Sequence, residues 1–72
     1  MYKIATTTIS QSSNKEIQAR LEFEKDYSLD EIIENATRGS VSASIQKSDR
    51  IVFIAADYQS YYDYVLITKI GG

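Results

Sequence analysis

The 72-residue chain contains no cysteine, histidine, proline or tryptophan, and only three glycines. Without cysteine, a disulfide framework and a thiolate metal site are excluded. Without histidine, the usual zinc, haem and nucleophile–histidine chemistries are excluded as well. These absences remove most classes of enzyme. We therefore expect no catalytic residue, no metal ligand and no cofactor, and a protein that is not an enzyme.

Long apolar runs are also missing. No stretch reaches the length that spans a membrane, and residues 1–6 lack the apolar core of a signal peptide. No repeat or proline-rich linker marks a second domain. We expect a single α+β domain over residues 1–72, located in the cytoplasm and without a membrane partner.

Neither sign of charge dominates the chain. Eight basic residues stand against ten acidic ones, and the net charge of −2 is too small to indicate a polyanion binder. The charge is segregated, because residues 22–34 hold six acids and one base, a local −5, and the remainder carries +3. The six acids, here called the acidic block, are Glu22, Glu24, Asp26, Asp30, Glu31 and Glu34.

The run Ile51–Ala56 is apolar at every position, and Val65–Ile67 is apolar at consecutive positions. A strand built from such a run is apolar on both faces, so both faces need cover. A chain this short provides one good helix, which covers one face. We predict that Arg50–Tyr58 is the central strand and that the chain self-associates through the uncovered face as a two-fold homodimer.

Two strands open the chain. Tyr2–Ser10 is rich in β-branched residues, which favour a pleated surface. Ile4 and Ile9 fall on opposite parities, so either a bulge lies between them or one of them points away from the core. Lys15–Tyr27 alternates strictly, with one solvated and mainly acidic face. Its other face is predicted to lie in the core and consists of Ile17, Ala19, Leu21 and Phe23.

The segment Ser28–Glu31 is a capping box. In this motif the Ser28 hydroxyl accepts from the Glu31 N–H, and the Glu31 carboxylate accepts from the Ser28 N–H. A helix of about three turns follows, and Gly39 suits the left-handed position that ends it. Its apolar stripe is Leu29, Ile32, Ile33 and Ala36.

Three more strands complete the prediction. Ser40–Gln46 alternates with a period of two and is predicted as a strand, with a continuation of the helix as the alternative. Gln59–Ser60 separates the predicted central strand from a last strand at Tyr61–Ile70. The order is therefore ββαβββ. We expect an α+β fold, with a largely antiparallel sheet and one short helix on one face, against Phe53 or its neighbours.

Four tyrosines fall within the seven positions from Tyr58 to Tyr64, mixed with serine, glutamine and aspartate. This composition is typical of a protein-binding surface, because a tyrosine offers much contact area for few torsions. The alternative is structural, since tyrosine favours strands and half of these rings would then cap the core. We expect Tyr58 and Tyr61 to form the interface pair, with Tyr64 leaning toward the core. The predicted partner-binding residues of this segment are Asp57, Tyr58, Gln59, Tyr61, Tyr62 and Asp63.

The acidic block is the second candidate surface. Acids there complement a basic surface on a nucleic-acid-handling complex, and such complementarity speeds association. The structural alternative is that a solvated strand face and a helix N-terminus attract acids. From the block, Glu22, Glu24 and Asp26 join the predicted partner-binding residues. A single-stranded nucleic acid is a further alternative partner, which Asp57 and Asp63 disfavour because they repel phosphates.

After the last predicted strand the sequence reads Gly71-Gly72. This pair resembles the tail of ubiquitin-like proteins and of the small sulfur carriers of thiamin and molybdopterin synthesis. The opening hairpin-then-helix order also resembles the β-grasp fold. The resemblance implies a carrier whose Gly72 is adenylated and then thiolated or conjugated, with Gly71 and Gly72 as its functional residues.

In overall type, this compact, cysteine-free and mildly acidic chain resembles small phage-encoded accessory proteins, including anti-CRISPR proteins. That resemblance implies a stoichiometric binder that acts in the host cytoplasm. We therefore expect a non-catalytic protein-interaction module, an inhibitor that occupies the surface of a larger host nucleic-acid-handling machine. The ubiquitin-like carrier and the single-stranded nucleic-acid binder are the alternatives.

Overall fold

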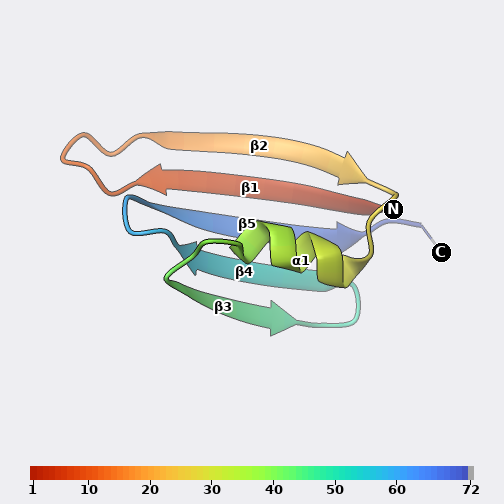
Figure 1. The fold of residues 1–72 in the computed structure, drawn as a ribbon. Coiled ribbons are helices and arrows are strands. Elements are labelled where there is room, and N and C mark those ends of the chain that lie inside the picture. The colour runs from red at the N-terminus through yellow and green to blue at the C-terminus, as the bar shows by residue number, and fades with distance from the viewer. Residues whose placement is uncertain (72) are drawn as a thin grey trace.

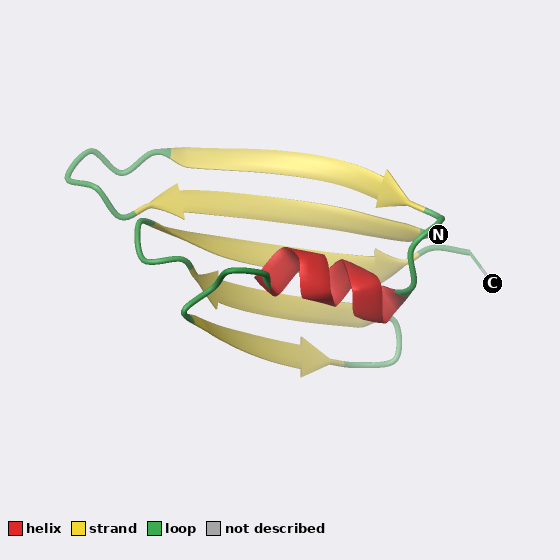
Figure 2. Cartoon of the chain, viewed as in Figure 1, coloured by secondary structure: helices red, strands yellow, loops and turns green. Residues whose placement is uncertain are grey.

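The computed structural model of the chain describes residues 1–71. It contains five strands and one helix in the predicted ββαβββ order (Figure 1 and Figure 2). These elements are β1 (Tyr2–Ser10), β2 (Ile17–Glu24), α1 (Leu29–Thr37), β3 (Ser42–Lys47), β4 (Ile51–Asp57) and β5 (Tyr61–Lys69). The α+β prediction is confirmed, and β3 excludes the continued helix. Within the described residues, no helix is long and apolar enough to cross a membrane.

The strands form one sheet in the order β2-β1-β5-β4-β3, and every neighbouring pair is antiparallel. β1 and β2 form a hairpin, and β3, β4 and β5 follow one another as a meander. The two units join where β1 pairs with β5, in a register that sets Ile4 opposite Ile67. β5 is therefore the central strand. The prediction that Arg50–Tyr58 is the central strand is wrong. This segment forms β4, which lies next to the central strand, because β1 and β2 extend the sheet on the far side of β5.

The helix α1 connects the two edge strands, β2 and β3, which run parallel to each other. In Figure 1 the chain leaves β2, returns along α1 in front of the sheet and enters β3. This crossover is right-handed, as nearly all such connections are, and its hand decides which face of the sheet the helix covers. The covered side is here called the helix face.

The core lies between α1 and the helix face. Its buried members are Ile32 and Ile33 from α1, together with Val52, Ile54, Ala56, Val65 and Ile67 from β4 and β5. The helix therefore rests on the neighbours of Phe53 and not on Phe53 itself. Burial of these aliphatic side chains supplies the main stabilisation of the fold.

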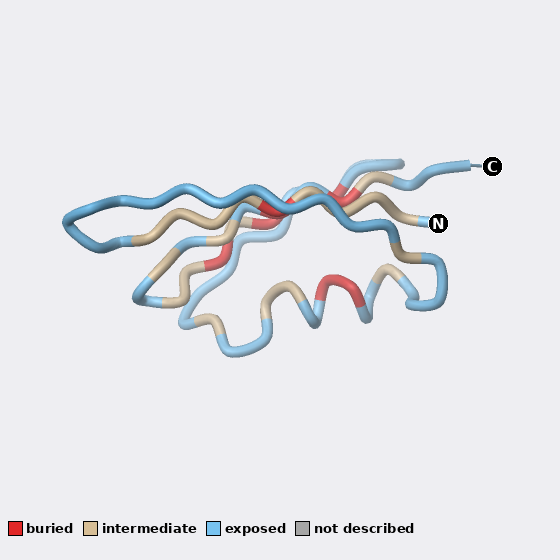
Figure 3. Tube along the Cα trace, turned by 90° about the horizontal axis from the view of Figure 1, so that it is seen from above, coloured by how far each residue is buried: buried red, intermediate tan, exposed pale blue. Residues whose placement is uncertain are grey.

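The opposite face of the sheet has no cover, as the view from above in Figure 3 shows. It is here called the open face, and it carries Leu21, Ala5, Leu66 and Phe53 as neighbours across four strands. Eight large apolar side chains on it are each between 37% and 69% exposed, and these are Ile17, Leu21, Phe23, Ile51, Phe53, Tyr62, Tyr64 and Leu66. An apolar surface this continuous is unusual on a monomeric protein.

The prediction for β2 is wrong about which face is buried. The residues predicted to lie in the core are on the open face, and they are Ile17, Ala19, Leu21 and Phe23. Leu21 pairs with Ala5, which pairs with the open-face residue Leu66. Glu22 and Glu24 consequently lie on the helix face. Alternation predicts that two faces of a strand differ, but the crossover decides which of them is covered.

β1 has a continuous register with both of its neighbours, so it contains no bulge. Ile4 packs against the core on the helix face. Ile9 pairs with Tyr62 and points to the open face. Of the two alternatives for this strand, the structure therefore selects the one in which an isoleucine points away from the core.

The capping box is formed as predicted. The Ser28 hydroxyl accepts from the Glu31 N–H at 3.3 Å, and the Glu31 carboxylate accepts from the Ser28 N–H at 3.3 Å. Beyond Thr37, Gly39 has a φ of 80°, in the left-handed region that favours glycine. Both ends of α1 are therefore set by local sequence.

We expect Ser28→Ala to lower the free energy of unfolding by about 0.5–2 kcal/mol, because the backbone N–H of Glu31 loses its acceptor. Ser13→Ala, in the exposed β1–β2 loop, is the control and should change it by less than about 0.5 kcal/mol. Urea unfolding followed by circular dichroism measures both variants. Equal midpoints for Ser28→Ala and the unsubstituted chain would show that the box contributes nothing.

Candidate protein-interaction site

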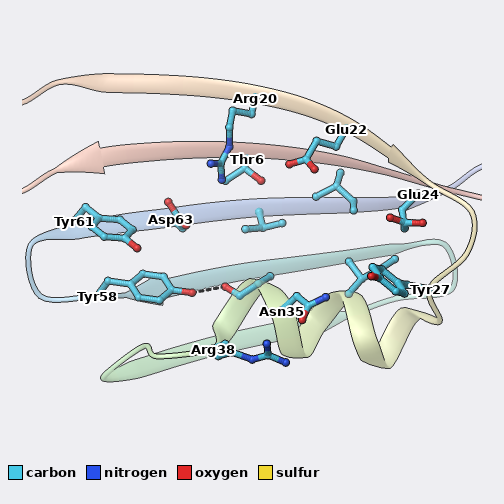
Figure 4. A pocket seen from close by; sticks show the side chains of 14 residues that line it. Thr6, Arg20, Glu22, Glu24, Tyr27, Asn35, Arg38, Tyr58, Tyr61 and Asp63 are labelled. Carbon is cyan, nitrogen blue, oxygen red and sulfur yellow. Dashed lines mark hydrogen bonds between the residues drawn. The ribbon is translucent and has the colours of Figure 1, made fainter.

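A groove of about 360 Å³ opens on the helix face between α1 and β2 (Figure 4). It exists because α1 lies over β4, so the β1–β2 side of the sheet extends past the helix. Its floor includes the apolar side chains of Ile4 and Val65 together with the buried Thr6, and α1 contributes Ile32 and Ala36 to one wall. Such a volume suits a small ligand or the anchoring side chains of a protein partner.

Two stacked tyrosines lie at the end of the groove near the β4–β5 turn. The ring centroids of Tyr58 and Tyr61 are 4.8 Å apart, with 12° between the ring planes. The Tyr58 hydroxyl donates to the carbonyl of Ala36 at 2.6 Å, in the last turn of α1, where carbonyls lack helical partners. Burial raises the pKa of the Tyr58 phenol, and the charges of Asp63 and Tyr61 raise it further. Tyr58 therefore ties the turn to the helix.

The groove brings together residues from both surfaces that the sequence suggested. The predicted residues that line it are Glu22, Glu24, Tyr58, Tyr61 and Asp63. They come from segments far apart in the sequence, and they meet because β1 sits between β2 and β5 in the sheet. Neither the tyrosine segment nor the acidic block forms this site alone.

Some of these side chains already have partners within the fold. Asp63 accepts a hydrogen bond from the Thr8 hydroxyl, and Glu24 accepts from the Asp26 backbone N–H at 2.9 Å. Glu22 is exposed. Among residues 1–71, the only ion pair joins Arg38 to Glu34, so Glu22 forms no ion pair within the fold.

Two tyrosines of the predicted cluster lie on the other side of the sheet. Tyr62 and Tyr64 are 37% and 38% exposed on the open face, and Tyr64 stacks on Phe53 at a centroid distance of 6.3 Å. The expectation that Tyr64 leans toward the core is wrong, because its neighbour Val65 takes the core-facing parity. The tyrosine segment thus divides between two faces.

The remaining predicted residues are also outside the groove. Asp57 ends β4 on the open face and accepts from the Gln59 N–H at 2.8 Å and from the Gln11 amide at 3.3 Å. Gln59 is exposed in the β4–β5 turn with a φ of 75°. Asp26 is exposed in the loop between β2 and α1. Asp57 and Gln59 shape the turn that presents the tyrosines.

The sequence reasoning missed two arginines at the groove. Arg20 lies on β2 opposite Thr6, and Arg38 is the C-cap of α1. Arg20 shares its parity with Glu22 and Glu24, so the alternation in β2 was a signal that could have found it. No sequence signal marked Arg38, because only the fold brings the end of the helix beside the sheet. The rim of the groove is therefore of mixed charge.

Of the two tail glycines, the structure describes Gly71. Gly71 has a φ of 89°, and its carbonyl accepts from the Arg50 guanidinium at 3.1 Å. Gly72, the residue that a carrier would activate, lies outside the described residues. The carrier reading stays a prediction.

Within residues 1–71, no group of acidic side chains is arranged to hold a metal ion. Comparisons of the chain with protein-family models, with curated proteins and with solved structures give no match.

Proposed function

We propose that this chain is a non-catalytic protein-interaction module that binds a segment of a protein partner in the groove between α1 and β2. The main support is the arrangement of the groove, in which apolar side chains at Ile4 and Val65 are bordered by charged side chains and the Tyr61 ring. Protein interfaces have this arrangement, with an apolar centre, a polar rim, and tyrosine and arginine as frequent anchors.

The charged side chains at the rim indicate which kind of partner segment can bind in the groove. Glu22, Glu24 and Arg20 come from β2, Asp63 comes from β5 and Arg38 comes from the end of α1, which gives the rim a net charge of −1. A partner segment that fits presents an apolar side chain to the floor and a lysine or arginine to Glu22. A basic surface on a nucleic-acid-handling complex meets this requirement, and occupying such a surface is how the module would inhibit it.

We expect Tyr61→Ala to weaken partner binding at least 30-fold, about 2 kcal/mol, because the ring forms one side of the groove. Tyr62→Ala is the matched control, since the neighbouring ring lies on the open face and should leave affinity within about 3-fold. Partners captured from a lysate by the unsubstituted chain are identified by mass spectrometry, and their affinities for each variant are measured by biolayer interferometry.

Charge reversal gives a second arm of the same experiment. Glu22→Lys places a base where the partner's base should bind, whereas Glu16→Lys makes the same change in the exposed β1–β2 loop. A partner that tolerates both Glu22→Lys and Tyr61→Ala does not use the groove, and the proposal is then wrong. Loss of function on removal of Gly71 and Gly72, with groove variants unaffected, would favour the carrier instead.

A further inference from the structure

We propose that a second copy of this chain covers the open face, so that the protein is a two-fold symmetric dimer. The proposal is independent of the groove, which lies on the opposite side of the sheet. It explains why β2, at the edge of the sheet, places Leu21 and Phe23 in solvent at 60% and 58% exposure in the monomer. Large apolar patches that stay exposed on a single copy are typical of interaction sites.

The open face is large enough for a stable dimer. Five strands at about 4.8 Å spacing and seven residues at about 3.3 Å rise give a flat area of about 550 Å² per copy. Two copies therefore bury more than about 1,100 Å², before the relief of the side chains is counted, which exceeds the roughly 1,000 Å² of a specific interface. Central open-face residues such as Phe53 and Leu66 supply apolar contacts.

The charge of the open face favours a copy of itself over other occupants. Of the charged residues in the five strands, the register places only Lys3 and Asp57 on this face. They have opposite signs and lie near opposite ends of the sheet, on either side of β5. Two such faces do not repel each other. A single-stranded nucleic acid would stack on the aromatic rings but would find one lysine for its phosphates.

The relief of the face is also self-complementary. Tyr64 and Leu66 form a ridge along β5, and the positions of β1 that pair with them are the small residues Thr7 and Ala5, while Ile9 pairs with Tyr62 at one end. β1 is therefore a trough beside the ridge. In a two-fold arrangement the ridge of each copy can enter the trough of the other, and the same contact is made twice.

We expect the unsubstituted chain to sediment at its monomer mass of 8.1 kDa at low micromolar concentration and to approach twice that mass as the concentration rises to the submillimolar range. Leu66→Lys, which places a charge at the centre of the face, should raise the dimer dissociation constant at least 30-fold. Val41→Lys makes a comparable change at a residue that is 62% exposed outside the open face, and it should remain dimeric. Circular dichroism checks that both variants fold.

A cysteine cross-link gives a second measurement. The chain has no cysteine of its own, so an introduced cysteine is the only thiol that can react. Tyr64→Cys, near the centre of the face, should be joined to its counterpart in the second copy by a short thiol-specific cross-linker, whereas Val41→Cys should not. A monomer at every concentration, or a dimer that survives Leu66→Lys unchanged, overturns the proposal. So does a monomer that binds oligothymidylate through this face, because the face is then a nucleic-acid site.

Discussion

Ile54→Ala lowers the free energy of unfolding by about 2–5 kcal/mol, because it leaves a cavity beneath α1 where the side chain is fully buried. Ile51→Ala is the matched control. It removes the same atoms from the same strand, but Ile51 is 43% exposed on the open face, and the expected cost is about 1 kcal/mol. A domain of this size has only a few kcal/mol of net stability, so Ile54→Ala should be partly unfolded at 25 °C.

Chemical denaturation of both variants, followed by circular dichroism at low micromolar concentration, measures the difference without a contribution from association. The two costs depend on which face of β4 the helix covers. Equal costs would contradict the assignment of Ile54 to the covered face, and a larger cost for Ile51→Ala would reverse it.

Tyr58→Ala has the second largest expected effect, a loss of about 3 kcal/mol. The substitution removes a half-buried ring, its stack on Tyr61 and the hydrogen bond to the Ala36 carbonyl. Tyr58→Phe keeps the ring and should cost about 0.5–1.5 kcal/mol. Tyr62→Ala, the open-face control, should cost about 1 kcal/mol or less. If Tyr58→Ala and Tyr62→Ala have the same melting temperature, Tyr58 does not stabilise the contact between the β4–β5 turn and the helix.

The raised pKa of Tyr58 adds a dependence on pH to this result. Because burial holds the pKa of the phenol above its usual value of about 10, the unfolded chain releases this proton first as the pH rises. The contribution of Tyr58 is complete below the unfolded pKa and is lost as the pH rises through the folded one. Unfolding midpoints across this alkaline range should therefore fall less steeply for Tyr58→Phe than for the unsubstituted chain.

Local signals in the sequence predicted most of the secondary structure. The capping box at Ser28 set the start of α1, Gly39 set its end, and the period of two in Ser40–Gln46 separated β3 from the helix. Each of these features depends on residues a few positions apart. The order of elements and the fold class followed from them.

Features that depend on distant pairings were not predictable. The position of β5 at the centre follows from its register with β1, and nothing local in Tyr2–Ser10 specifies that partner. The face covered by α1 follows from the hand of the β2–β3 crossover, which requires the strand order first. The sequence therefore identified Glu22, Tyr58 and Tyr61 as candidates but not Arg38, which joins them only through the crossover.

Nuclear magnetic resonance with a dissolved paramagnetic gadolinium chelate tests most directly whether the sheet has one permanently covered face and one that a second copy covers. In a dilute sample the methyl groups of Ile51 and Leu66 should relax rapidly, and those of Ile54 and Ile67 should be protected. In a concentrated sample Leu66 should become protected, while Ile45, 44% exposed on the edge strand β3, stays accessible. Leu66 methyl groups that remain accessible at every concentration, or accessible Ile54 methyl groups, would contradict this account.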